Sequence, residues 1–221
     1  MTRTGIILFF ISSLLLISCS GKGGREKKIP ESKAEVTTAP DSTYLFNGSN
    51  LDGWEITNFG PQGPVYVSGG QVILSMGDGC TGITWKKEFP VMNYTITLEA
   101  KRVSGNDFFC GMTFPVGSDP LTLIVGGWGG ATVGLSSIDG KDASENETTK
   151  LMRFDNDRWY RICLTVKNDT VKTLIDDEVV VDFAVRNRTL SIRPEVDLSK
   201  PFGIASWRTT AALRNIRLEK L

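Results

Sequence analysis

The sequence predicts an all-β protein built as a two-sheet antiparallel β-sandwich. Three observations support this prediction: apolar residues recur at every second position, short runs of this kind end in Gly-rich or Asx-rich turns, and long runs with helical spacing are missing beyond the N-terminal segment. Residues 94–102 are the clearest case, with Tyr94 and Ile96 on one face and Glu99 and Lys101 on the other. Such alternation is typical of strands that bury one face only.

The N-terminal segment, residues 1–18, is expected to be a lipoprotein signal peptide. One early charge, Arg3, precedes an apolar run at 6–17 that is too short to span a bilayer as a helix. The run ends in Leu16-Ile17-Ser18-Cys19, which resembles a bacterial lipobox. We therefore expect cleavage before Cys19 and attachment of lipid chains to its thiol, which would anchor the protein to a membrane. The alternative is an ordinary signal peptide with an incidental cysteine.

Residues 19–42 follow this segment and predict a flexible tether. They are rich in Gly, Lys, Glu, Ser, Thr and Pro and contain almost no large apolar residues, so they cannot bury enough surface to offset the entropy of ordering. Together with Cys19, the tether indicates a protein of the bacterial cell envelope, lipid-anchored on the periplasmic or the outer side. The sequence leaves the oligomeric state open.

Residues 43–221 are long enough for one domain with a sizeable core. The whole chain carries 25 basic and 25 acidic residues, and this balance argues against nucleic acid as a partner. The charge balance favours neutral or weakly charged ligands such as sugars. Cys80, Cys110 and Cys163 make an odd number of thiols for an oxidising compartment, so at most two can pair, and their pairing stays open.

The strands of this domain are expected in chain order, each bounded by turn residues. The first two form a hairpin within 65–76, and the others lie at 94–102, 108–114, 121–125, 131–136, 159–167, 170–175, 178–183, 202–207 and 213–218. Short Asx turns join three consecutive strands, 159–183, into a meander. Two long polar connections, 136–154 and 187–201, are of a length that is usually functional or mobile.

Three stretches resemble the 3-keto-disaccharide hydrolase domain family: Leu45-Phe46-Asn47-Gly48 leading to Gly53-Trp54, the hairpin at 65–76, and the closing Leu213-Arg214-Asn215-Ile216-Arg217. The meander is similar to that of concanavalin A-like and laminin G-like jelly rolls. The resemblance implies a jelly roll whose concave sheet face can carry a sugar site. It also implies cleavage of glycosides with a ketone at C3: a base removes the proton on C2, an oxyanion site holds the enolate, and the C1 oxygen departs.

Glu99, Lys101 and Arg161 are the catalytic candidates. The chain contains no histidine, so Ser-His-Asp and Cys-His catalysis and imidazole metal sites are excluded, and acid-base chemistry falls to other side chains. Period-two alternation places Glu99 on the outward face of its strand as the possible base, with Lys101 and Arg161 on the same type of face as stabilisers of an enolate. The alternative is a ladder of solvated strand charges.

Trp128, Trp207, Arg208 and Asp107 are the substrate-binding candidates. Two glycines on each side of Trp128, within 126–130, favour an exposed platform for stacking on a sugar. Trp207 and Arg208 end a predicted strand, where the indole could stack on a sugar or pack in the core. Asp107 follows Gly-Asn and could instead simply close a turn.

No cofactor is identified from the sequence. Asp139 and Asp142 offer hard oxygen ligands for Ca²⁺, but their Asp-Gly-Lys-Asp spacing is more typical of a turn, so no metal site is predicted. Three functions stay open: a hydrolase or lyase of 3-keto-glycosides, a non-catalytic carbohydrate-binding module, and a protein-recognition sandwich. The first requires Glu99, Arg161 and Trp128 to meet in one hollow on a single sheet surface.

Overall fold

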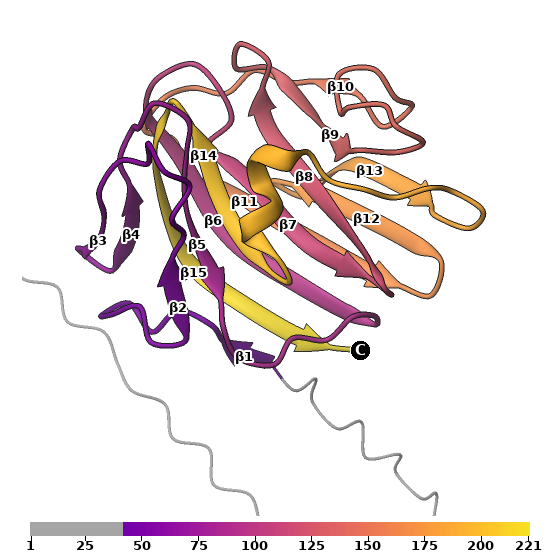
Figure 1. Cartoon of the computed structure of the whole chain (residues 1–221), viewed down its shortest axis with the longest axis horizontal. Coiled ribbons are helices and arrows are strands. Elements are labelled where there is room, and N and C mark those ends of the chain that lie inside the picture. Colours follow the sequence, from indigo (N-terminus) through magenta and orange to yellow (C-terminus); the bar gives the residue numbers. More distant parts are fainter. Residues whose placement is uncertain (1–41) are drawn as a thin grey trace, which may run out of the picture. The chain divides into compact units, whose positions relative to one another are not determined.

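The computed structural model describes residues 42–221, which form two antiparallel β-sheets packed face to face (Figure 1). The predicted fold class, an all-β two-sheet sandwich, is confirmed. The expected signal peptide, Cys19 and all of the tether except Ser42 lie outside the described residues.

Fifteen strands and one short helix make up the two sheets and their cover. The eight-stranded sheet contains β1 (Ser42–Tyr44), β3 (Val65–Ser68), β4 (Gln71–Leu74), β6 (Tyr94–Ser104), β11 (Tyr160–Lys167), β12 (Thr170–Ile175), β13 (Glu178–Ala184) and β15 (Thr210–Lys220). The seven-stranded sheet contains β2 (Trp54–Ile56), β5 (Cys80–Trp85), β7 (Cys110–Val116), β8 (Asp119–Gly127), β9 (Thr132–Ser136), β10 (Lys150–Leu151) and β14 (Gly203–Trp207). A 3₁₀ helix, η1, spans Pro194–Ser199. No helix within 42–221 is long and apolar enough to cross a membrane.

The chain crosses repeatedly between the two sheets, and both its first and its last described strands lie in the eight-stranded sheet. The eight-stranded sheet runs β13-β12-β11-β6-β15-β4-β3 with β1 paired to β15, and the other sheet runs β10-β9-β8-β7-β14-β5-β2. Every segment expected to form strands does so. The prediction missed β1, β2, β5 and β10. Among these, β5 begins at Cys80. That strand lacks the period-two signal because all of its residues are buried.

The core lies between the two sheets and is formed by the inward residue of each alternating pair. On β6 the inward residues Tyr94, Ile96 and Leu98 have no exposed surface. The Tyr94 hydroxyl donates a hydrogen bond of 2.6 Å to the carbonyl of Pro115, and it thereby links β6 of one sheet to β7 of the other. The buried phenol is therefore satisfied, as a polar group inside a core must be.

The seven-stranded sheet is covered on its outer face as well. In Figure 1, η1 lies in front of this sheet, and it packs on β5 and β14. Glycine makes this approach possible: a Cβ on Gly203 would lie 2.7 Å from the carbonyl oxygen of Ser199, and one on Gly134 would lie 3.0 Å from that of Ala143. The two long connections predicted from the sequence are thus the segments that dock on this face.

Truncation on the inward face of β6 should cost far more stability than truncation on its outward face. We expect Leu98→Ala to lower the free energy of unfolding by about 2–5 kcal/mol, because it opens a cavity in a fully buried site. The neighbouring Thr97→Ala, on the outward face, should cost less than about 1 kcal/mol. Urea unfolding of both variants measures the difference, and equal losses would contradict the assigned facing of this strand.

Candidate functional site

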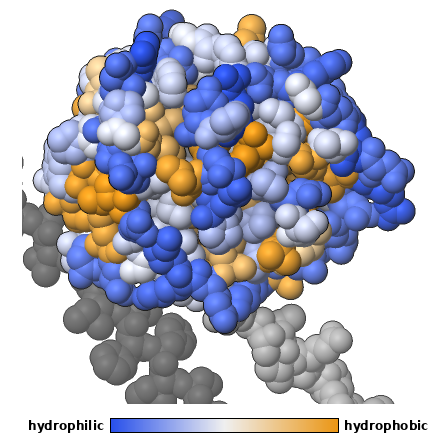
Figure 2. Space-filling model, viewed as in Figure 1, coloured by the Kyte–Doolittle hydropathy of each residue, from blue (hydrophilic) through white to orange (hydrophobic). Residues whose placement is uncertain are grey.

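A pocket of about 260 Å³ opens on the outer face of the seven-stranded sheet. It lies where β5 and β7 begin and β8 and β14 end, and one wall comes from residues 187–201, here called the strap. The same view in Figure 2 shows hydrophobic surface exposed between hydrophilic side chains on this face. The lining residues are Cys80, Asp107, Phe108, Thr122, Ile124, Trp128, Ser136, Arg193, Glu195, Val196 and Trp207.

The indole rings of Trp128 and Trp207, two of the predicted substrate-binding residues, line this pocket. Trp128 sits in the β8–β9 loop with a left-handed backbone (φ 48°) and keeps 43% of its surface exposed. Trp207 ends β14, and its backbone N–H donates to the carbonyl of Phe108 at 3.0 Å. A large exposed indole at a pocket provides an apolar surface for stacking without loss of core packing.

Asp107 supplies a carboxylate to the same pocket. Its Oδ1 accepts a hydrogen bond of 2.7 Å from the backbone N–H of Phe108, which fixes the side chain in the turn before β7. Its Oδ2 accepts only a long bond of 3.4 Å from the N–H of Gly129. One oxygen of this carboxylate therefore keeps most of its accepting capacity for a ligand.

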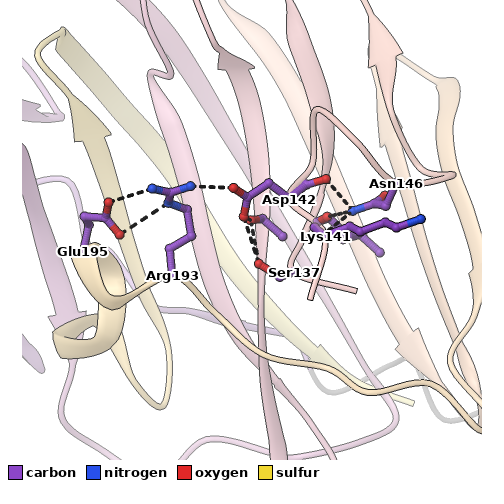
Figure 3. Close-up of polar contacts among 8 residues, drawn as sticks. Ser137, Lys141, Asp142, Asn146, Arg193 and Glu195 are labelled. Carbon is purple, nitrogen blue, oxygen red and sulfur yellow. Dashed lines mark hydrogen bonds and ion pairs between the residues drawn. The ribbon is translucent and has the colours of Figure 1, made fainter. Parts of the chain in front are cut away.

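Arg193 and Glu195 of the strap form an ion pair at the pocket (Figure 3). The guanidinium donates to both oxygens of Glu195, at 2.9 Å from Nη2 and 3.3 Å from Nε, and donates from Nη1 to Asp142 at 2.5 Å. The hydrogen bond from Arg193 lowers the pKa of Glu195 below its ordinary value, and the pair raises the pKa of Arg193. Glu195 is therefore a poor proton acceptor, while Arg193 is a fixed positive charge.

The loop that carries Asp142 is itself held in place. Figure 3 shows Asn146 beside it, and the Asn146 amide donates to the carbonyls of Leu135, at 2.7 Å, and of Asp142, at 2.8 Å. Asp142 Oδ1 also accepts a bond of 3.0 Å from the hydroxyl of Ser137. This network ties the strap to the 137–149 loop, so Arg193 is oriented from two sides.

The thiol of Cys80 also lines the pocket, but it is not set up as a nucleophile. Burial, followed by the nearby charge of Glu195, raises the pKa of Cys80 to about 12. The group is therefore protonated at neutral pH, and only the thiolate is strongly nucleophilic. Cys80, Cys110 and Cys163 are all free thiols.

Glu99 lies away from this pocket, on the outward face of β6 in the eight-stranded sheet. Its carboxylate accepts from Arg214 Nε at 2.7 Å and from Asn215 Nδ2 at 2.5 Å. The hydrogen bond from Arg214 lowers the pKa of Glu99. Glu99 is thus an ion-paired strand residue with reduced basicity.

Lys101 and Arg161 share that surface with Glu99. Lys101 lies 3.7 Å from Asp157 and over the ring of Trp159, and Arg161 lies 3.1 Å from Asp177. Since the outward faces of the two sheets of a sandwich point in opposite directions, these three residues cannot share a ligand with the pocket. The expectation that Glu99, Arg161 and Trp128 meet in one hollow is therefore wrong.

Arg208 is beside the pocket without lining it. Its guanidinium lies over the ring of Trp207, 5.7 Å from the ring centroid, and pairs with the exposed carboxylate of Asp78 at 2.6 Å. The structure thus brings together Asp107, Trp128 and Trp207 of the predicted substrate-binding residues. Sequence reasoning missed Arg193 and Glu195, although the length of the connection that carries them had suggested a functional rim.

Within residues 42–221 no group of three or more Cys, Asp or Glu side chains is placed to hold a metal ion. Asp139 and Asp142, weighed from the sequence as calcium ligands, instead accept from arginines: Asp139 from Arg188 at 2.7 Å, and Asp142 from Arg193. Their carboxylates fasten the 137–149 loop to the strap.

Comparison with known proteins gives a family and a fold. Residues 41–219 match the model of the 3-keto-alpha-glucoside-1,2-lyase-like domain. No curated protein sequence is significantly similar to the chain. Among solved structures, a carbohydrate-binding module from Bacillus subtilis shares 17% identity at a TM-score of 0.53, over 80% of this chain and 100% of its own. A laminarinase from Flavobacterium sp. UMI-01 shares 16% identity at a TM-score of 0.51, over 81% and 98%.

The Arg193–Glu195 pair should make a pH-dependent contribution to stability. A carboxyl whose folded pKa is lowered contributes stability above its unfolded pKa, and this contribution is lost as pH falls through the folded pKa. We expect Glu195→Gln to lower the free energy of unfolding at neutral pH by less than about 1 kcal/mol, because the pair is partly exposed. The difference from the wild type should vanish in acid. Urea unfolding over a pH series tests this, and a difference independent of pH would contradict it.

Proposed function

Because the chain belongs to the 3-keto-alpha-glucoside-1,2-lyase-like domain family, we propose that its pocket binds a glycoside with a ketone at C3 and cleaves it by elimination across C1 and C2. One observation supports this proposal above the others. The carboxylate of Asp107, the indoles of Trp128 and Trp207 and the guanidinium of Arg193 line a single pocket. These are the groups needed to take a proton, hold a sugar ring and stabilise an oxyanion.

Binding rests on the two indoles and on the size of the pocket. Its volume of about 260 Å³ is slightly below the range of small-molecule sites, which span roughly 300–1,000 Å³. The apolar face of a sugar ring can stack on Trp128 or Trp207, while its hydroxyls reach polar groups at the rim. A compact saccharide therefore suits this site.

The reaction needs one base and one stabilising cation. The ketone at C3 acidifies the proton on C2, so the carboxylate of Asp107 removes that proton, and the electron pair of the C2–H bond forms an enolate on the C3 oxygen. The enolate then collapses, a double bond forms between C1 and C2, and the bond from C1 to the aglycone oxygen breaks. The departing oxygen takes up a proton from water and leaves as an alcohol, and Asp107 releases to water the proton that it removed from C2.

Asp107 is the preferred base among the carboxylates considered. Both oxygens of Glu195 accept hydrogen bonds from the guanidinium of Arg193. Both oxygens of Glu99 accept from the guanidinium of Arg214, and Oε2 accepts from Asn215 as well. The carboxylate of Asp107 instead accepts from the backbone N–H groups of Phe108 and Gly129. A carboxylate that is already neutralised by a guanidinium has less affinity for a substrate proton. Glu99 also lies on the eight-stranded sheet, whereas the pocket lies on the seven-stranded sheet.

Arg193 is the preferred stabiliser of the enolate. Three of its five N–H donors are used by Asp142 and Glu195, so two remain for a ligand. A fixed guanidinium in a partly desolvated pocket stabilises a developing oxyanion without having to reorganise during the reaction.

A second function, carbohydrate binding without cleavage, is favoured by one feature of Asp107. Its Oδ1 accepts from the Phe108 N–H at 2.7 Å, which is the ordinary role of an aspartate that caps a turn. If this is the only role of the carboxylate, the pocket holds a saccharide and releases no product.

Replacing the proposed base should separate binding from cleavage. We expect Asp107→Asn to lower the rate of aglycone release from a 3-keto-disaccharide by at least about a hundredfold, because general bases contribute on this order. Asn keeps an oxygen for the Phe108 N–H, so the turn and the affinity for the sugar should persist. Product release is measured chromatographically and affinity by calorimetry.

Glu99→Gln is the matched control, since it removes a carboxylate of the opposite sheet and should leave release unchanged. If Glu99→Gln stops the reaction while Asp107→Asn does not, the assignment of the base is overturned. Binding by the wild type without any product would favour the second function.

Removal of the exposed indole should weaken sugar binding. We expect Trp128→Ala to raise the dissociation constant about two- to tenfold, because a stacked aromatic ring contributes roughly 0.5–1.5 kcal/mol beyond its buried area. Trp159→Ala, which removes an indole from the opposite sheet, is the control and should leave affinity unchanged. Isothermal calorimetry measures both, and equal effects would show that the sugar does not bind in the pocket.

A further inference from the structure

A buried arginine outside the pocket contacts the segments that carry two of its residues. Arg102 is only 5% exposed, and the four hydrogen bonds of its guanidinium all go to main-chain carbonyls. Nε donates to Asp107 at 3.3 Å and Nη1 to Phe154 at 3.3 Å, while Nη2 donates to Gly126 at 3.3 Å and to Gly130 at 3.0 Å. A buried charge is tolerated only when its hydrogen bonds are satisfied in this way.

Three of the four acceptor carbonyls belong to the two segments that carry Asp107 and Trp128. Gly126 and Gly130 flank Trp128 on both sides, so a single guanidinium nitrogen fixes both ends of the loop that presents the indole. The third acceptor is the carbonyl of Asp107, the residue whose carboxylate lines the pocket. Asp107 Oδ2 in turn accepts from Gly129 in the same loop, so the turn and the loop are joined both through Arg102 and directly.

The two glycines make room for the guanidinium. A Cβ on Gly126 would lie 2.7 Å from Nη2 of Arg102, and one on Gly130 would lie 3.3 Å from it. Both also have positive φ, +80° and +106°, which side chains rarely adopt. The glycine pairs around Trp128 therefore serve the contact with Arg102 as well as the exposure of the indole.

Arg102 reaches these segments from the other sheet. It occupies the inward position that follows Ala100 on β6, and its guanidinium lies over the ring of Phe109, 5.2 Å from the centroid. Burial lowers the pKa of Arg102 and the charge of Asp107 opposes that shift, but a guanidinium remains protonated in proteins. The core of the sandwich thus holds a fixed cation directly behind the pocket.

We propose that Arg102 is a positioning residue of the pocket, which sets the placement of the Asp107 carboxylate relative to the Trp128 indole through the carbonyls on either side of them. This inference rests on the proposed function for its consequence in catalysis, but its structural part is independent. Displacement of a base by about 1 Å can cost on the order of a hundredfold in rate. Loss of the four hydrogen bonds of Arg102 should therefore lower kcat.

The test compares Arg102→Lys and Arg102→Met in the purified protein with Leu98→Ala. Lysine keeps the charge but presents its three donors at one point, so it cannot span four carbonyls. Leu98→Ala destabilises the same strand without touching the site. The first readout is amide hydrogen exchange at Phe108, Gly129 and Gly130, and the second is kcat and KM on a 3-keto-disaccharide.

For Arg102→Lys we expect at least a tenfold loss of protection at these amides with protection of core amides unchanged, and a tenfold or greater fall in kcat with KM altered less than threefold. Arg102→Met should show the same local loss, or fail to fold if the unpaired carbonyls cost too much. Wild-type exchange and kcat in Arg102→Lys would overturn the proposal. An equal fall of kcat in Leu98→Ala would overturn it as well, because the effect would then follow stability alone.

The two proposals can fail separately. If the wild type releases no product, the elimination reaction is wrong, while the exchange comparison still decides whether Arg102 fixes the loop and the turn. Unchanged protection in Arg102→Lys would exclude the positioning role even if the wild type is an active lyase.

Discussion

The requirement that one sheet be buried on both of its faces shapes most of this structure. The core covers the inward face of the seven-stranded sheet, and the strap and the 137–149 loop cover the outward face. Segments can approach a sheet this closely only where side chains are small, as at Gly134 and Gly203. The pocket is the space that this second layer leaves open, so its walls are connections whose positions depend on ion pairs between them, such as Arg193 with Asp142.

The two outward faces of the sandwich differ in how their polar side chains are held. Among residues 42–221, no second layer of connections covers Glu99, Lys101 and Arg161 on the eight-stranded sheet. These residues pair with neighbouring charges and remain partly exposed. Ion pairs of this kind contribute little to stability and reduce the basicity of the carboxylates. In the pocket, the Asp107 carboxylate accepts from the main-chain N–H of Phe108, and Arg102 fixes the Trp128 loop by donating to the carbonyls of Gly126 and Gly130. Arg193 is held between the carboxylates of Asp142 and Glu195. That difference separates a solvated surface from a preorganised one.

The alternation of side chains was sufficient to predict the sandwich, and three short stretches, at 45–54, 65–76 and 213–217, were sufficient to indicate its family. The alternation could not predict the site. A period of two shows which residues share a face of one strand, but it does not show to which sheet the strand belongs. Glu99 and Trp128 were therefore expected in one site, whereas Glu99 lies on the eight-stranded sheet and Trp128 follows a strand of the seven-stranded sheet. Arg193 and Glu195 carry no periodic signal. Arg102 did carry one, since an arginine at the inward position after Ala100 breaks an apolar series and indicates a buried, fully bonded cation.

The first described strand joins the sheet that does not bear the pocket. β1 pairs with β15 in the eight-stranded sheet, from Ser42 opposite Glu219 to Tyr44 opposite Arg217. A protein immobilised through its N-terminal segment, whether by the expected lipid at Cys19 or by a tag on a sensor chip, would be attached on the back of the sandwich. Because the pocket lies on the outer face of the other sheet, an attachment at Ser42 and a saccharide in the pocket would occupy different sheets of the domain.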